Sequence, residues 1–249
     1  RVRLADGSSV RARRLLVATG LVDELPVVPG LRERWGRDVL HCPYCHGYEV
    51  RDRAIGILAT GPMAAHQAQL FRQLSADVTL FLHTAPQPTD EQWEQLAARG
   101  ISVVDGVVAA IEVADDRLTG VRLASGEVIA LDAVVVGPRF TARVPDGLGL
   151  ESTEVVMGGH VVGSQIDADA TGATAVPGVW VAGNVADMRA QVVSSAAAGL
   201  WTAANINMDL IDEEIRAAVA ARRPFSARTE QDLCDQVLGD RRHGLMGTR

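Results

Sequence analysis

The chain reads Ala54-Ile55-Gly56-Ile57-Leu58-Ala59-Thr60-Gly61-Pro62 at the point that decides its fold. A short apolar run that ends in a glycine turn is typical of a buried parallel strand. Pro62 suits the first turn of a helix, because that position needs no backbone N–H donor. We therefore expect a strand at 54–58 and a helix from Pro62 to about Leu74.

The alternation of strand and helix continues along the chain. Residues 78–82 and 101–104 are apolar runs typical of strands. Between them, Thr89 and Gln92 make a capping box for a helix that runs to Arg99. The resulting order, β-α-β-α-β, is that of a mononucleotide-binding unit.

Further strands are expected on both sides of this unit. Two hairpin-like strands meet at 125–126, and the apolar run 133–136 closes the unit. Residues 15–20 and 178–183 each read as a strand followed by glycine, and a long Ala-rich helix begins at about Gln191. The predicted fold class is α/β, with two Rossmann-like, three-layer ββα domains.

The two ends of the sequence carry local signals. Residues 1–7 read as a β-hairpin with its Asp-Gly turn. Residues 211–249 form a charged tail that we expect to be helical, with the acidic run 212–214 in a first turn. Within this tail, Cys234 is expected to be a small buried apolar residue, and an active-site role for His243 is one hypothesis.

Composition excludes several classes of function. The formal net charge of −7 argues against a nucleic-acid-binding protein, which needs a basic face. All 24 cationic residues are arginine, and without lysine neither Schiff-base chemistry nor a Walker-type phosphate loop is available. No uncharged stretch is apolar enough to predict a membrane span. The three cysteines suggest a reducing compartment, so we expect a cytoplasmic protein.

The chemistry is predicted at Cys42-Pro43-Tyr44-Cys45, which His41 and His46 flank. Two thiols at this spacing can close a small disulfide ring, and a pair of this kind in a reducing compartment is catalytic or metal-binding. If a helix begins at the motif, its dipole lowers the pKa of the Cys42 thiol. His46 then supplies a titratable proton donor beside the pair. We interpret the motif as a redox-active disulfide.

Two other interpretations of the motif remain open. Cys42, Cys45 and His46 also satisfy the CxxCH pattern of covalent haem attachment. The set His41, Cys42, Cys45 and His46 could ligate zinc, although six consecutive residues rarely surround one tetrahedral ion. Neither alternative explains why the motif lies between a Pro/Gly segment and a Rossmann-like strand, so we assign no metal site.

In this order, the motifs resemble those of the thioredoxin reductase family of two-domain flavoproteins. The likeness covers roughly residues 1–208 and rests on Ala18-Thr19-Gly20, Cys42-Pro43-Tyr44-Cys45, the central βαβ unit, 177–184 and Ala190-Gln191-Val192. In that family, a pyridine-nucleotide domain that carries the CxxC interrupts the flavin domain. The resemblance therefore implies flavin-domain segments at 1–38 and 140–210, a nucleotide-type domain at 39–139 and a helical tail at 211–249. It also implies that the family's first βαβ, with its pyrophosphate loop, would lie upstream of Arg1.

The resemblance implies roles for individual residues. Cys45 would face the flavin as the charge-transfer thiol, Cys42 would attack the substrate disulfide, and His46 stands where the family usually has an acid/base aspartate. The residues implied to bind FAD are Ala18, Thr19, Gly20, Gly183, Asn184, Ala190, Gln191 and Val192. The chain departs from the family at two of them, because Asn184 replaces an aspartate and Ala190 an arginine.

The expected nicotinamide site departs further from the pattern. Its fingerprint has Ala59 where the first glycine belongs and keeps Gly61, a weak candidate for the nucleotide loop. Residues 73–98 contain no arginine or lysine to bind the 2′-phosphate of NADPH. A similar loss is found in thioredoxin-reductase-like dithiol oxidases, which close disulfides in metabolites such as gliotoxin and holomycin and pass electrons to oxygen.

Three hypotheses about function follow. The first is an FAD-dependent thiol–disulfide oxidoreductase whose substrate is a disulfide or dithiol, either a protein or a small molecule. Its direction is open, since a reductase needs NADPH whereas a dithiol oxidase needs only FAD and oxygen. The second is a non-catalytic redox sensor or binding module, and the third a c-type haem protein. Homodimers are common in the resembling family, which makes a homodimer one expected state.

Overall fold

The computed structural model describes residues 1–222 and 226–238. The chain divides into two compact units, Arg1–Thr202 and Ala203–Arg249. In the first unit, the centre of the fold is a five-stranded parallel sheet with strand order β5-β12-β6-β7-β8. Its strands are β5 (Val39–Leu40), β6 (Ile55–Leu58), β7 (Val78–Phe81), β8 (Ser102–Val104) and β12 (Ala133–Val136).

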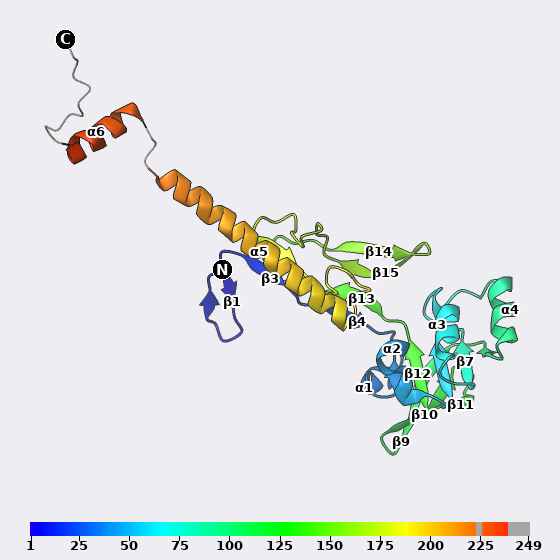
Figure 1. Ribbon diagram of the computed structural model, residues 1–249. Coiled ribbons are helices and arrows are strands. Elements are labelled where there is room, and N and C mark those ends of the chain that lie inside the picture. The colour runs from blue at the N-terminus through cyan, green and yellow to red at the C-terminus, as the bar shows by residue number, and fades with distance from the viewer. Residues whose placement is uncertain (223–225, 239–249) are drawn as a thin grey trace, which may run out of the picture. The chain divides into compact units, whose positions relative to one another are not determined.

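Successive residues of the central strands face opposite layers, as the pleat of a strand requires. On β6, Ile55 and Ile57 join a core shared with Phe71 and Leu96, which belong to the helices α3 (Ala64–Phe71) and α4 (Asp90–Ala98). Leu58 lies instead in a second core. Figure 1 shows both helices beside this sheet. Burial on both faces explains why these strands read as continuous apolar runs.

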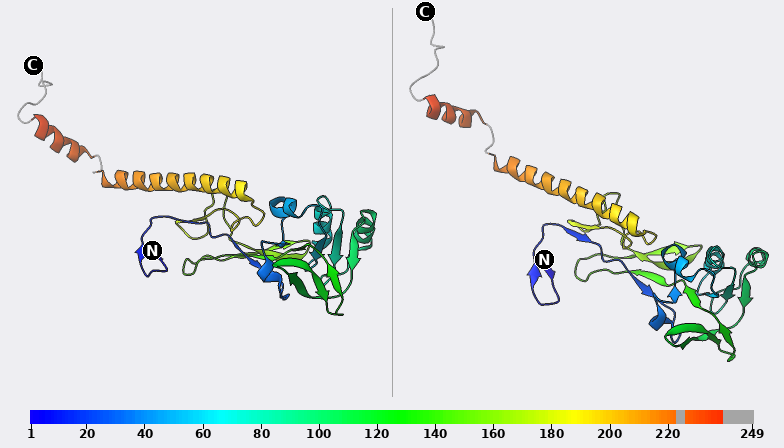
Figure 2. Two further views of the ribbon diagram at one scale, coloured as in Figure 1. Left: turned by 90° about the horizontal axis from the view of Figure 1, so that it is seen from below. Right: turned by 60° about the horizontal axis from the view of Figure 1, so that its bottom comes forward.

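The second core lies under an antiparallel sheet with strand order β11-β10-β9. Its strands are β9 (Val108–Ala114), β10 (Arg117–Leu123) and β11 (Val128–Ala130). Both views in Figure 2 show these green strands on the side of the parallel sheet opposite the teal helices. Two sheets and a helical layer confirm the predicted three-layer ββα arrangement.

A second set of strands carries the remaining motifs. Here β3 (Leu15–Val17) pairs in parallel with β16 (Val179–Val181), and Val17 and Val181 lie in a third core with Ile166. A four-stranded sheet has the order β14-β15-β13-β4. Its strands are β4 (Leu21–Glu24), β13 (Arg139–Ala142), β14 (Thr153–Met157) and β15 (His160–Gln165).

Short elements complete the first unit. The hairpin predicted at the start of the chain is present as β1 (Val2–Arg3) and β2 (Ser9–Val10). A one-turn helix, α1 (Leu31–Arg34), precedes β5, and α2 (Pro43–His46) follows it and leads into a 3-10 turn at Gly47–Val50.

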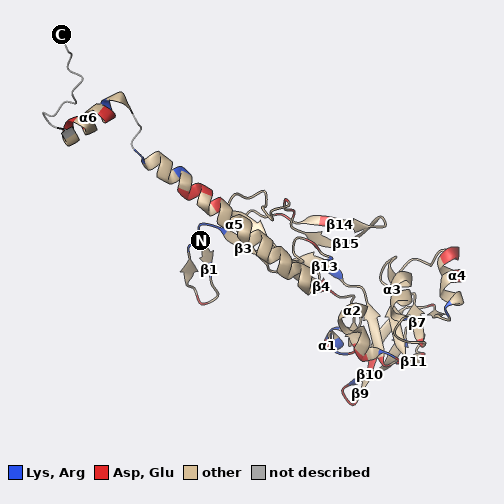
Figure 3. Cartoon of the chain, in the orientation of Figure 1, with Lys and Arg blue, Asp and Glu red and all other residues tan. Residues whose placement is uncertain are grey.

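The helix expected near Gln191 is α5 (Val192–Ala221), and α6 (Ala227–Leu238) follows it. The acidic run 212–214 was expected in a first turn, but it lies inside α5, where Figure 3 shows it as a red band. That expectation was wrong because α5 continues through the run. Among the described residues, no helix has the length and apolar character needed to cross a membrane.

The remaining expectations about the elements differ in detail. The helix predicted from Pro62 to Leu74 is shorter at both ends, and the capping box of Thr89 and Gln92 is present at α4. Cys234 was expected to be buried, but it is exposed on α6, where Leu233 and Val237 are exposed as well. His243 lies outside the described residues.

Candidate active site

The redox motif sits on the turn that follows β5. Cys42 is the N-cap of α2, and its carbonyl accepts hydrogen bonds from the backbone N–H groups of Cys45 (3.3 Å) and His46 (3.2 Å). Pro43 occupies the first helical position, where its missing N–H costs nothing. The helix is a single turn, so its dipole is much smaller than that of a longer helix.

The two thiols of the motif differ in environment. Cys42 is half-buried and Cys45 is exposed, and both are free cysteines. A hydrogen bond to Cys42 raises the pKa of the Cys45 thiol to about 11, with partial desolvation and the charge of Cys42 acting in the same direction. The raised pKa favours the protonated thiol at Cys45. His46 is exposed beside them.

Cys45 reaches toward the start of α5. Its Sγ lies 3.6 Å from Oε1 of Gln191 and donates a hydrogen bond to it. The backbone N–H of Gln191 donates to Oγ of Ser194 (2.8 Å), which fixes the first turn of the helix. Val192 is 86% exposed in this turn, and Ala190 precedes it. An apolar side chain left open beside a redox thiol provides a surface for a planar ring.

The glycines predicted to bind FAD meet at the carboxyl ends of β3 and β16. Gly20 and Gly183 both have left-handed backbones, with φ of +74° and +87°. A Cβ on Gly20 would lie 3.3 Å from Oδ1 of Asn184, a tight contact at a backbone conformation that residues other than glycine rarely adopt, so glycine is favoured here. The hydroxyl of Thr19 donates to the carbonyl of Arg143 (2.5 Å), which holds the first loop in place.

The structure thus brings together most of the residues that the sequence nominated. Ala18 and Ala182 continue the paired strands, and the backbone N–H of Ala182 donates to the carbonyl of Val17 (3.1 Å). The carboxyl ends of neighbouring parallel strands are the usual place for ligands in such sheets.

The expected nicotinamide loop has a different character. Gly61 has no atom within 4 Å of the place its Cβ would occupy, and its backbone is not left-handed, so the fold itself does not require glycine there. At the carboxyl end of β7, Nδ1 of His83 accepts a hydrogen bond from the backbone N–H of Val108 (3.1 Å). Burial lowers the pKa of His83, so its ring is neutral and engaged where a cation would be needed.

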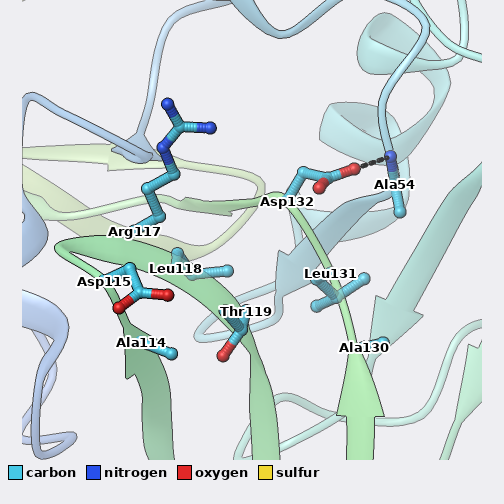
Figure 4. A pocket seen from close by; sticks show the side chains of 9 residues that line it. All are labelled: Ala54, Ala114, Asp115, Arg117, Leu118, Thr119, Ala130, Leu131 and Asp132. Atoms are coloured by element: carbon cyan, nitrogen blue, oxygen red, sulfur yellow. Dashed lines mark hydrogen bonds between the residues drawn. The ribbon is translucent and has the colours of Figure 1, made fainter.

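One cavity lies elsewhere. It has a volume of about 670 Å³ and opens at the amino ends of β6 and β12. Figure 4 shows Asp115, Arg117 and Asp132 around it, with Asp132 bonded to the backbone N–H of Ala54. Ligands of parallel sheets bind at the opposite, carboxyl edge, so we do not assign this cavity to the redox site. Within residues 1–222 and 226–238, no group of three or more acidic, histidine or cysteine side chains could hold a metal ion.

Comparison with known proteins identifies the class. Residues 1–204 match the family described as "Pyridine nucleotide-disulphide oxidoreductase". The chain belongs to this family, whose thioredoxin-reductase-like members are FAD-dependent disulfide oxidoreductases.

The chain is also similar to individual proteins. The chain is 32% identical to "Thioredoxin reductase aclD" of Aspergillus oryzae over 45% of this chain and 41% of that protein. It is 31% identical to "Thioredoxin reductase tcpT" of Claviceps purpurea over 58% of this chain and 48% of that protein. It therefore spans less than half the length of these two curated relatives. The crystal structure of HlmI is 47% identical and superposes with a TM-score of 0.77, covering 92% of this chain and 68% of that one.

The residues present fit an FAD. Gly20 approaches Asn184 closely, and a Cβ on Gly20 would fill the space between the two loops. Val192 is exposed and directly follows Gln191, which accepts a hydrogen bond from the Cys45 thiol. Open, glycine-lined loops let a cofactor reach the backbone, and an exposed apolar turn can cover a flat ring.

Proposed function

We propose that this chain carries the redox centre of an FAD-dependent thiol–disulfide oxidoreductase. The observation that supports this most strongly is the placement of Cys45, whose sulfur lies 3.6 Å from Gln191 beside the glycine cradle. Cys42 and Cys45 alternate between two thiols and one disulfide. Closing the disulfide releases two electrons and two protons, and opening it takes them up again.

The two cysteines take different roles in this proposal. Cys42 exchanges with the substrate sulfur, and Cys45 exchanges electrons with the cofactor side. The raised pKa of Cys45 favours uptake of a proton by this sulfur when the disulfide opens, and the same proton leaves when the disulfide closes. His46, exposed on the same turn, accepts and returns the proton of the substrate thiol.

The cofactor would be held by the loops at the carboxyl ends of β3 and β16. Ala18, Thr19 and Gly20 line one side, and Gly183 and Asn184 line the other. The turn at 190–192 would cover one edge of the ring. FAD supplies the acceptor and donor of an electron pair.

We further propose that the natural direction is dithiol oxidation without NADPH. His83 is neutral and held by Val108, and residues 73–98 offer no arginine or lysine for a 2′-phosphate. An NADPH-dependent reductase needs a cationic side chain for the 2′-phosphate, whereas a dithiol oxidase does not, because it does not bind NADPH. The substrate would be a dithiol, either a small molecule or a protein. A cytoplasmic location, a homodimer and the domain boundaries at 38, 139 and 210 stay predictions.

Anaerobic flavin reduction tests this proposal. The flavin-loaded protein is mixed with NADPH in one sample and with dithiothreitol in another, and the visible flavin band is followed. Bleaching by dithiothreitol that reverses in air, with no bleaching by NADPH, is the expected result. Bleaching by NADPH within seconds would refute the oxidase direction, and bleaching by neither would refute the enzyme.

A further inference from the structure

A half-buried histidine lies next to the redox pair. His41 joins β5 to Cys42, and its Nδ1 lies 3.1 Å from the carbonyl oxygen of Val136, the last residue of β12. A carbonyl only accepts, so Nδ1 carries the proton and donates it. The assignment of the tautomer follows from this partner.

A second contact fixes the backbone of the same residue. Nε2 of Gln67, on α3, donates to the carbonyl oxygen of His41 at 3.1 Å. It also lies 3.4 Å from Nδ1 of His41, but that nitrogen is already a donor to Val136, so the carbonyl is the partner of Gln67. The ring of Phe140, on β13, meets the imidazole edge to face with centroids 5.0 Å apart.

Three elements therefore hold the residue that precedes Cys42. The same end of β12 also binds the nucleotide loop, because the hydroxyl of Thr60 donates to the carbonyl of Gly137 at 3.1 Å. The Cys42 side of the motif is tied to the parallel sheet, whereas Cys45 on the other side is exposed.

Disulfide closure depends on such restraint. A disulfide forms only within a narrow range of Cα and Cβ distances and dihedral angles. A pair already held in that range loses less conformational entropy when it closes, so the equilibrium moves toward the disulfide.

We infer that His41 is a positioning residue for the redox pair: its hydrogen bond to Val136 holds Cys42 where the disulfide closes, and so favours the oxidised form. The inference rests on the proposed function, because it needs Cys42 and Cys45 to form a disulfide. His41 has no proposed contact with substrate or cofactor.

The electrostatics of the site agree with a neutral donor. Burial lowers the pKa of His41, while the bond to Val136 and the nearby carboxylate of Asp23 act in the opposite direction. A neutral ring with its proton on Nδ1 makes the bond to Val136 at physiological pH.

The test is the thiol–disulfide equilibrium of the pair in His41→Phe, His41→Asn and a control, His66→Asn. The whole protein is equilibrated without oxygen in mixtures of reduced and oxidised dithiothreitol, and the free thiols are then trapped by alkylation. Mass spectrometry gives the fraction of Cys42 and Cys45 that is alkylated, and hence the fraction that is in the disulfide. Oxidised dithiothreitol takes the two electrons and two protons that the two thiols release. His66 lies on α3, next to Gln67, and is exposed.

The expected results separate the hydrogen bond from the ring. His41→Phe keeps the packing on Phe140 but has no N–H, and the equilibrium constant for oxidation should fall about tenfold, a shift of about 30 mV. His41→Asn places an amide N–H near the position of Nδ1 and should stay within about twofold of the parent. His66→Asn should equal the parent.

Other outcomes overturn the inference. An unchanged equilibrium in His41→Phe refutes it, and an equal loss in His41→Asn refutes the role of the hydrogen bond. If circular dichroism shows that His41→Phe is unfolded, His41→Leu replaces it, because leucine also has no N–H to donate to the carbonyl of Val136; a shift toward the dithiol supports the inference, and no shift refutes it. A parent pair that never forms a disulfide instead refutes the proposed function, and the inference with it.

Discussion

Removing the sulfur of Cys42 should make Cys45 more reactive. In the parent, the hydrogen bond to Cys42 is the main cause that raises the pKa of Cys45 to about 11, from an ordinary value of 9.0. The raised value favours the neutral thiol, so Cys45 is protonated at neutral pH. Cys42→Ala removes both the hydrogen bond and the charge of the neighbour, and the pKa should fall toward its ordinary value.

The size of the effect follows from the two pKa values. At pH 8, the thiolate fraction of Cys45 rises from about one in a thousand to about one in ten, a gain of about 100-fold. A less basic thiolate is a weaker nucleophile, and a Brønsted slope of about 0.5 over two pKa units takes back about tenfold. The net prediction is alkylation about tenfold faster in Cys42→Ala.

The assay is the rate of alkylation by iodoacetamide, followed at Cys45 by peptide mass spectrometry. Cys234 is exposed and serves as the internal standard in the same sample. The inflection of the rate against pH should move down from about 11. Alkylation of Cys45 at an equal or lower rate in Cys42→Ala would refute the effect of Cys42 on the pKa of Cys45.

Three further changes test the fold. Gly20→Ala places a Cβ 3.3 Å from Oδ1 of Asn184 at a φ of +74°, and urea unfolding should show a loss of about 1–2 kcal/mol together with weaker flavin retention. Arg34→Ala leaves the half-buried carboxylate of Asp38 without its 2.5 Å ion pair and should cost about 3–5 kcal/mol in the same measurement. Burial raises the pKa of Asp38, but the hydrogen bonds from Arg34 and the backbone outweigh burial, so the pKa lies below its ordinary value of 3.8. The stability that the ion pair contributes is therefore present above about pH 4 and should be lost as the pH falls through the pKa of the folded protein. Thr89→Ala removes the capping box of α4 and should cost about 1 kcal/mol, seen as a lower urea midpoint.

The central sheet could be predicted from the sequence because its strands are buried on both faces. Ile55, Ile57 and Leu58 on β6 are all within 1% of complete burial, and such runs have a strong apolar signal. The strand β9 has a weaker apolar signal, because Ala109, Ala110 and Ala114 occupy three of its seven positions, although it pairs with β10 as a local hairpin. The strands β14 and β15 were not predicted either. Their side chains are mostly exposed, Val156 and Val161 among them, so these strands lack the long apolar run of a buried strand.

The candidate site divides in the same way. Gly20 and Gly183 could be nominated because a glycine after a strand is a local pattern, and their left-handed backbones now give the reason for glycine. The hydrogen bonds of His41 could not be predicted, because its partners Val136 and Gln67 lie 95 and 26 residues from it in the sequence. No periodicity or motif connects residues across such separations.

The most direct test of the central claim is flavin reduction by a dithiol in Cys45→Ser. The parent, Cys45→Ser and the control Cys234→Ser are each loaded with FAD and mixed with dithiothreitol in the absence of oxygen. The account predicts rapid bleaching in the parent and in Cys234→Ser, and bleaching slowed at least about 100-fold in Cys45→Ser, because the electron pair has lost its route through the Cys42–Cys45 disulfide. Bleaching of Cys45→Ser at the rate of the parent would contradict the account, since electrons would then reach the flavin without the redox pair.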